Sequence, residues 1–183
     1  GLVQLSSTGD IAENIRVASG FIHQAADEGA DFVFTPEVTS ILEPRTRVMM
    51  EKVTPEGEDQ ALKSFRAVAK ARKIWLSIGS LAILLDDGRL ANRSFLIGPD
   101  GQIVARYDKI HMFDVDLPNG ERYQESKNYQ AGTRAVLAPL PWGKVGLSVC
   151  YDLRFPDLYR SYAQAGASFL TVPSAFTRGT GEA

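Results

Sequence analysis

Residues 146–156 read Gly146-Leu147-Ser148-Val149-Cys150-Tyr151-Asp152-Leu153-Arg154-Phe155-Pro156. The apolar run at 145–149 predicts a short buried strand, since continuous runs of this length are typical of central strands. Residues 158–163 predict a helix with Pro156 near its first turn, a position where proline is favoured. Cys150, the only cysteine in the chain, therefore lies on a strand-to-helix turn.

A cysteine at such a turn has two interpretations. The turn can expose the sulfur and direct free backbone N–H groups toward the atom that the sulfur attacks. Helix N-termini and nearby cations also lower the pKa of a thiol, and the thiolate is the nucleophilic form. Alternatively, Cys150 is a small buried hydrophobic residue. A catalytic role requires that the rest of the chain supply a base and a group that stabilises an anion.

The composition is that of an ordinary globular protein. The chain has 183 residues, of which 44% are hydrophobic and 23% charged, and its formal net charge is -2. This near-neutral charge gives no electrostatic case for a nucleic-acid partner. The sequence contains no signal-peptide pattern and no apolar stretch of membrane-spanning length, so we expect a cytoplasmic protein without membrane contact.

Cysteine and histidine are too few for several kinds of site. One cysteine excludes an intrachain disulfide framework and a Cys-rich metal site, and His23 and His111 leave little for a zinc site. The chain begins inside an apparent strand without an initiator Met and stops in loop sequence at residues 179–183. We therefore expect one domain over residues 1–183, truncated slightly at its start and more at its C-terminus.

The N-terminal part predicts a strand, a helix and a second strand. Residues 2–5 form the first expected strand, and Asp10 can cap a helix that Gly29 ends, because apolar positions recur there at helical spacing. Residues 31–35 form a short apolar strand that Pro36 stops. Glu37 thus follows the C-terminal end of a strand, the edge where α/β sheets place ligand sites, although it can equally be an ordinary loop carboxylate.

The middle and the end of the chain predict further strands. Residues 41–53 are irregular and form either a lid or a packed loop, and residues 57–73 predict a second helix. We expect a mixed sheet with helices covering one face. The expected strands are 74–85, 93–97, 103–107, 135–140, 144–149 and 168–172, with a hairpin turn at Asp86-Asp87-Gly88.

Lys109 also lies just past an expected strand, which ends at Tyr107. It is either a surface charge or, if buried beside a thiol, a group that stabilises a thiolate and later an oxyanion. The loop at 114–132 is long and polar, as functional loops often are. His111 is a further candidate for a base, provided that it lies within hydrogen-bond reach of the thiol. If their strands lie side by side, Glu37, Lys109 and Cys150 meet in one pocket.

Three stretches of the chain resemble the motifs of the nitrilase superfamily of carbon–nitrogen hydrolases, in the branch of Nit-type amidases. Phe34-Thr35-Pro36-Glu37 resembles the family's glutamate motif, and residues 106–111 resemble its lysine motif. Residues 146–156 resemble its cysteine motif. Glu125 matches a second family glutamate, Ala131-Gly132 the glycine that follows, and residues 173–177 the region after the next strand. The similarity covers essentially the whole chain in the family's order.

This resemblance implies an α-β-β-α sandwich that forms a homodimer or a higher homo-oligomer. It also implies a catalytic triad of Glu37, Lys109 and Cys150, with no metal or organic cofactor. Glu37 would take the thiol proton, while Lys109 and the backbone N–H of Tyr151 would stabilise the oxyanion. Glu125 would position Lys109 or the substrate amine.

The same resemblance implies a small-molecule amide as substrate. The matching arginine and threonine of Nit-type amidases, Arg154 and Thr177 here, lie near a substrate carboxylate, which favours an acidic ω-amide. Arg154 can equally form a structural salt bridge to Asp152 or Asp157. Nitriles and N-carbamoyl compounds remain open as substrates, and so do two other functions: a catalytically silent scaffold of the same family, and a redox-sensing thiol on an unrelated fold. Family members also continue well past residue 183, which leaves open whether this chain alone is active.

Overall fold

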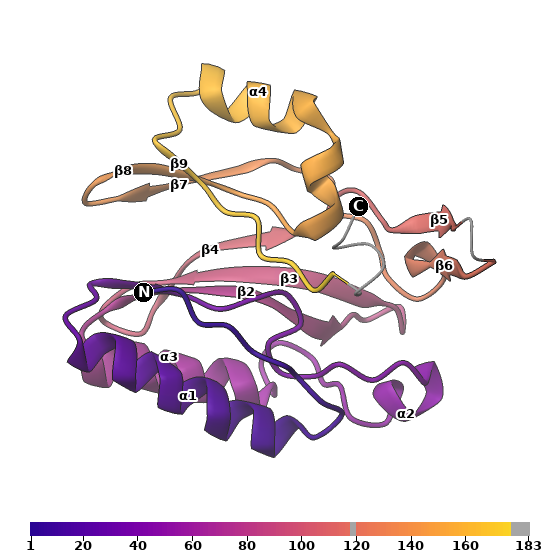
Figure 1. Cartoon of the computed structure of the whole chain (residues 1–183), viewed down its shortest axis with the longest axis horizontal. Coiled ribbons are helices and arrows are strands. Elements are labelled where there is room, and N and C mark those ends of the chain that lie inside the picture. Colours follow the sequence, from indigo (N-terminus) through magenta and orange to yellow (C-terminus); the bar gives the residue numbers. More distant parts are fainter. Residues whose placement is uncertain (118–119, 177–183) are drawn as a thin grey trace.

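The computed structural model describes residues 1–117 and 120–176, which stack in the order helices, sheet, sheet, helix (Figure 1). Helices α1 (Ile11–Asp27) and α3 (Gln60–Arg72) lie side by side against one face of the first sheet. The second sheet lies against the other face, and α4 (Pro156–Gln164) covers its outer side. The expected α-β-β-α sandwich is therefore confirmed.

The first sheet has four strands in the order β1-β2-β3-β4. Strand β1 pairs with β2 in parallel, because helical crossovers connect them, whereas β2, β3 and β4 form an antiparallel meander. Their bounds are Phe32–Phe34 for β1, Trp75–Leu84 for β2, Leu90–Ile97 for β3 and Ile103–Asp108 for β4.

The second sheet has three strands in the order β7-β8-β9. Strand β8 (Gly143–Leu147) lies in the middle, antiparallel to β7 (Val136–Leu140) and parallel to β9 (Phe169–Leu170). Buried apolar side chains fill the space between the two sheets, and a larger apolar core lies between the first sheet and its helices. The buried residues of the inter-sheet core are Leu96, Tyr107, Ala138, Val145, Leu147 and Val149.

Small elements surround one end of the sandwich. The segment expected to be irregular at 41–53 contains the short helix α2 (Thr46–Met50). The long loop at 114–132 contains the strand pair β5 (Asp114–Asp116) and β6 (Arg122–Gln124), followed by the 3₁₀ helix η1 (Glu125–Lys127). A second 3₁₀ helix, η2 (Cys150–Arg154), joins β8 to α4.

Local signals set most element boundaries. The Asp10 carboxylate caps α1 by accepting from the Glu13 N–H at 3.1 Å, as expected. Helix α3 begins later than expected, because the Asp59 carboxylate accepts from the Leu62 N–H at 2.7 Å and caps it. The expected strand at 2–5 is wrong. There the chain makes a single bridge from Leu2 to Phe34, because the next donor of this parallel ladder would be Pro36, which has no N–H.

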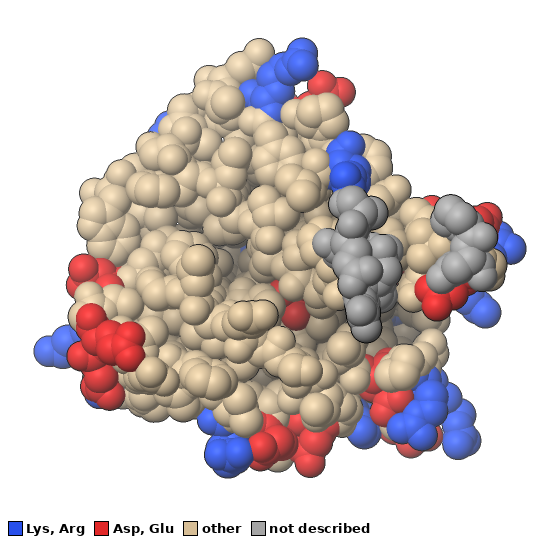
Figure 2. All heavy atoms as spheres, in the orientation of Figure 1, with Lys and Arg blue, Asp and Glu red and all other residues tan. Residues whose placement is uncertain are grey.

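The face of the molecule in Figure 2 has its charged side chains mainly along the rim, whereas most of its centre is uncharged. Among the residues that the structure describes, none of the helices combines the length and the apolar character needed to span a bilayer.

Candidate active site

Three strand ends converge on one pocket of about 510 Å³. Glu37 follows β1, Lys109 follows β4 and Cys150 follows β8, and all three side chains line this pocket. The three strands do not lie side by side in one sheet, the arrangement in which the sequence predicted that these residues would meet. Strands β1 and β4 are opposite edges of the first sheet and β8 is the centre of the second, so the pocket forms where the two sheets face each other.

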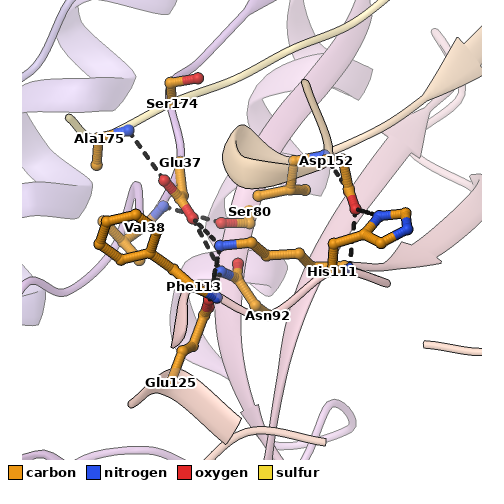
Figure 3. A network of polar contacts seen from close by, with 12 residues as sticks. Glu37, Val38, Ser80, Asn92, His111, Phe113, Glu125, Asp152, Ser174 and Ala175 are labelled. Atoms are coloured by element: carbon orange, nitrogen blue, oxygen red, sulfur yellow. Dashed lines mark hydrogen bonds and ion pairs between the residues drawn. The ribbon is translucent and has the colours of Figure 1, made fainter. Parts of the chain in front are cut away.

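Glu37 is 7% exposed, and both of its carboxylate oxygens accept hydrogen bonds. Oε1 accepts from Asn92 Nδ2 at 3.0 Å and from Lys109 Nζ at 3.3 Å. Oε2 accepts from the backbone N–H of Ala175 at 2.9 Å (Figure 3). Segments far apart in the sequence therefore fix the orientation of this carboxylate.

The backbone after Glu37 is strained. Val38 has a φ of 49°, which is a rare conformation for a β-branched residue. Its N–H donates to the Ser80 hydroxyl at 2.9 Å, which holds the loop against β2 (Figure 3). The loop lies so close to β2 that a Cβ at Gly79 would be 2.2 Å from the Pro36 carbonyl oxygen. Such strain is typical of functional sites, where packing holds a conformation that the local sequence disfavours.

Lys109 is 2% exposed and makes its ion pairs with two glutamates. Its Nζ lies 2.8 Å from Glu125 Oε2, 3.1 Å from Glu125 Oε1 and 3.3 Å from Glu37 Oε1. Burial opposes the charge on this amine, but attraction to Glu37 and Glu125 outweighs it and raises the pKa of Lys109. Lys109 is therefore a buried cation and not the surface charge that the sequence also allowed.

Glu125, the first residue of η1, also accepts from the backbone N–H of Phe113 at 2.7 Å. Its carboxylate thus contacts the lysine on one side and the start of the β5–β6 hairpin on the other. This contact holds the hairpin over the pocket.

Cys150 begins η2 with a φ of 50°, and its N–H donates to the Pro173 carbonyl at 2.9 Å. A nucleophile on a strained turn of this kind presents its side chain to the pocket. Tyr151 is the second residue of η2, so its backbone N–H has no acceptor within the helix. Burial and the Glu37 carboxylate raise the pKa of the Cys150 thiol to about 12, although Lys109 acts in the opposite direction.

Asp152 connects the cysteine segment to the lysine segment. It is fully buried, and it accepts from the Tyr107 hydroxyl at 2.7 Å and the Val149 N–H at 2.9 Å. It also accepts from the His111 N–H at 3.0 Å and lies 2.7 Å from His111 Nδ1 (Figure 3). His111 stacks on Phe155 and does not belong to the described lining of the pocket, so the structure does not support it as a base for the thiol.

Arg154 is exposed and does not belong to the described lining of the pocket. The expected alternative, a salt bridge to Asp152 or Asp157, is absent among the described residues as well. A different arginine, Arg122 of β6, lines the pocket and forms an ion pair with Asp116 at 3.2 Å. Thr177 lies outside the residues that the structure describes.

Sequence reasoning missed the neutral donors of the site. Asn92 of β3 donates to both glutamates, and its signal was a buried-strand position occupied by an amide, with Leu90 and Ala91 before it. The N–H groups of Phe113 and Ala175 carry no such signal, because every residue except proline has a backbone donor.

Comparison with known proteins places this site in a family. The family model described as carbon-nitrogen hydrolase matches residues 1–183. The chain is 37% identical to a deaminated glutathione amidase of Dictyostelium discoideum and 36% identical to omega-amidase NIT2 of Homo sapiens. Each alignment covers 100% of this chain and 65% of the relative, so the chain spans about two thirds of their length. The crystal structure of the C. elegans NitFhit protein superposes with a TM-score of 0.89 at 31% identity, covering 100% of this chain and 45% of that one.

Proposed function

The chain belongs to the carbon–nitrogen hydrolase family, within the nitrilase superfamily and beside its Nit-type amidases. From this premise we propose that residues 1–183 form a single catalytic domain that hydrolyses the amide of a small carboxylated compound through a cysteine thioester. The observation that supports this proposal best is the meeting of Glu37, Lys109 and Cys150 in one pocket, with both charged groups buried.

Glu37 acts as the general base in this mechanism. Because burial and the charge of Glu37 raise the pKa of the Cys150 thiol to about 12, little of it is ionised near neutral pH, so attack requires that a base take the proton. Glu37 lines the pocket with Cys150, and its negative charge raises the pKa of that thiol. The sulfur then attacks the amide carbonyl carbon while its proton passes to Glu37.

Lys109 and the backbone N–H of Tyr151 stabilise the oxyanion that this attack creates. Lys109 is suited to this role, because a buried ammonium keeps its charge and acts where little water screens it. As the intermediate collapses, Glu37 returns the proton to the departing amine and ammonia leaves. Glu37 then takes a proton from water as the water oxygen attacks the thioester carbon. The C–S bond breaks, Glu37 returns this proton to the departing sulfur, and the products are the carboxylic acid and the free thiol of Cys150.

Two of the relatives are named deaminated glutathione amidase and omega-amidase, which supports an amide as the substrate of this chain. The pocket lining supports a short chain, because Phe113, Tyr123, Tyr129 and Tyr151 bound it. The substrate carboxylate would be held either by Arg154, which the family resemblance favours, or by Arg122, which the pocket lining favours. Comparing KM for an anionic and a neutral amide in Arg154→Ala and Arg122→Ala separates these two assignments.

Ammonia release from a panel of ω-amides, nitriles and N-carbamoyl compounds tests the proposal. The purified protein should turn over a carboxylated ω-amide, and Cys150→Ala and Glu37→Gln should each lose at least about 10³-fold in rate. Glu13→Gln, which changes an exposed carboxylate on α1, serves as the control and should keep the wild-type rate. Turnover by Cys150→Ala at the wild-type rate would end the thiol mechanism.

A further inference from the structure

Asn92 lies between the two glutamates of the site. It is the third residue of β3 and is 3% exposed. Its Nδ2 donates to Glu37 Oε1 at 3.0 Å and to Glu125 Oε1 at 3.2 Å (Figure 3). A primary amide has two N–H hydrogens, so one side chain can serve both carboxylates at once.

The chemistry of these partners fixes the orientation of the amide. Rotating it by half a turn would place Oδ1, an acceptor, against two carboxylates that can only accept. In the observed orientation Oδ1 is buried and no donor among the described residues reaches it. A buried acceptor without a hydrogen bond destabilises the folded state. The two hydrogen bonds from Nδ2 to the glutamates therefore decide the orientation of the amide.

The charges around Asn92 explain why such a donor is needed. The pocket holds two carboxylates, Glu37 and Glu125, beside one ammonium, that of Lys109. Of the other titratable groups in the lining, the Cys150 thiol and the Tyr129 hydroxyl have their pKa raised by burial and by the glutamate charges, and the cation Arg122 is paired with Asp116. Besides Lys109, the two carboxylates accept from neutral donors only, which are Asn92 Nδ2 and the backbone N–H groups of Phe113 and Ala175 among the described residues.

The backbone of Asn92 also holds the lysine. Its carbonyl accepts from the Lys109 N–H at 3.0 Å, which joins β3 to the end of β4. Arg93, the next residue, pairs with Asp108 through two hydrogen bonds of 2.6 and 2.9 Å. Because side chains alternate along a strand, this ion pair fixes the register of the two strands from their opposite face.

We propose that Asn92 is a positioning residue of the hydrolysis, which holds Glu37 and Glu125 on the same ammonium and so keeps the Glu37 carboxylate in place to act on Cys150. The catalytic role of Asn92 in this proposal rests on the proposed function. The hydrogen-bonded arrangement itself can be tested without a substrate.

The experiment replaces Asn92 and follows the pH dependence of two rates. Asn92→Leu keeps the approximate volume and removes the donor, and Asn92→Asp keeps the shape and adds a negative charge. Ser94→Ala is the matched control, because Ser94 is a buried residue of the same strand whose hydroxyl donates to the Ile78 carbonyl, away from the glutamates. The first rate is alkylation of Cys150, the single cysteine, by iodoacetamide. The second is amide turnover, with kcat and KM measured separately.

At low pH the alkylation rate should fall as a carboxylate of the pair becomes protonated; we call this part of the profile the acidic limb. It should move to higher pH by about one unit or more in both Asn92 variants, because two carboxylates without the Asn92 donor retain a proton more readily. In turnover, kcat should fall by roughly 10- to 100-fold, with KM within about threefold of wild type. Ser94→Ala should leave the limb and both constants unchanged. If Asn92→Leu does not fold, the profile of Asn92→Asp decides.

Three results would overturn the inference. One is a wild-type limb and kcat in a folded Asn92 variant, and another is an equal shift in Ser94→Ala. The third is an alkylation rate without any acidic limb in all proteins, which would mean that no carboxylate assists the thiol. If wild-type protein shows the limb but hydrolyses no amide, the proposed function fails, while the alkylation profiles still decide the role of Asn92.

Discussion

Replacing Lys109 with Met should reveal how much of the site depends on one buried cation. The substitution keeps the length and most of the volume of the side chain, so it opens little cavity. It leaves the carboxylates of Glu37 and Glu125, whose side chains are 8% and 14% exposed, facing each other without the ammonium that now lies 2.8 to 3.3 Å away. Removing one partner of a buried ion pair costs about 3–5 kcal/mol, because the remaining charge is uncompensated.

The size of this loss should depend on pH in a defined direction. Without Lys109, burial and mutual repulsion raise the folded-state pKa of the two glutamates above the unfolded value of about 4.3. A group whose pKa is raised by folding favours the folded state below the unfolded pKa, and this contribution is lost as pH rises through the folded pKa. The difference in free energy of unfolding between wild type and Lys109→Met should therefore be small near about pH 4 and reach its full size near about pH 8.

Urea unfolding of wild type and variant at both pH values measures this difference. Lys63→Met is the control, since Lys63 is exposed on α3 and should change the free energy of unfolding by less than about 0.5 kcal/mol at either pH. Turnover by Lys109→Met should fall by about 10²–10³-fold through loss of an oxyanion donor. An equal loss of stability at both pH values would refute the reasoning, because the loss would then come from packing and not from charge.

Three further perturbations test other parts of the argument. Gly79→Ala should lower the free energy of unfolding by at least about 3 kcal/mol, since its Cβ would lie 2.2 Å from a backbone carbonyl oxygen. Gly20→Ala in α1, where a Cβ meets no other atom, should raise it by about 0.5–1 kcal/mol. Equal thermal midpoints of the two variants would contradict this. Asp152→Asn should lower the free energy of unfolding in urea by about 2–4 kcal/mol, because an amide cannot accept the four hydrogen bonds that the buried carboxylate accepts. An unchanged free energy of unfolding would mean that Asp152 does not link the cysteine segment to the lysine segment. Glu37→Gln should lower the pKa of the Cys150 thiol from about 12, because the charge of Glu37 helps to raise it; an unchanged ultraviolet thiolate titration would speak against their proximity.

The sequence alone determined the local structure of this protein and the identity of its principal groups. Short apolar runs predicted most strands, Asp10 predicted the start of α1, and the Asp86-Asp87-Gly88 turn predicted the β2–β3 hairpin. These features are encoded within a few residues, which is the range over which backbone propensity and capping act. The motifs around Glu37, Lys109 and Cys150 likewise identified the family.

Only the tertiary structure decided how those groups meet. The sequence did not reveal that the three strand ends belong to two facing sheets, that Asn92 bridges Glu37 and Glu125, or that Arg154 lies outside the described pocket lining while Arg122 lies within it. Glu37 and Asn92 are 55 residues apart. Contacts over such a separation depend on how sheets and helices pack, and local residue patterns carry no record of that packing.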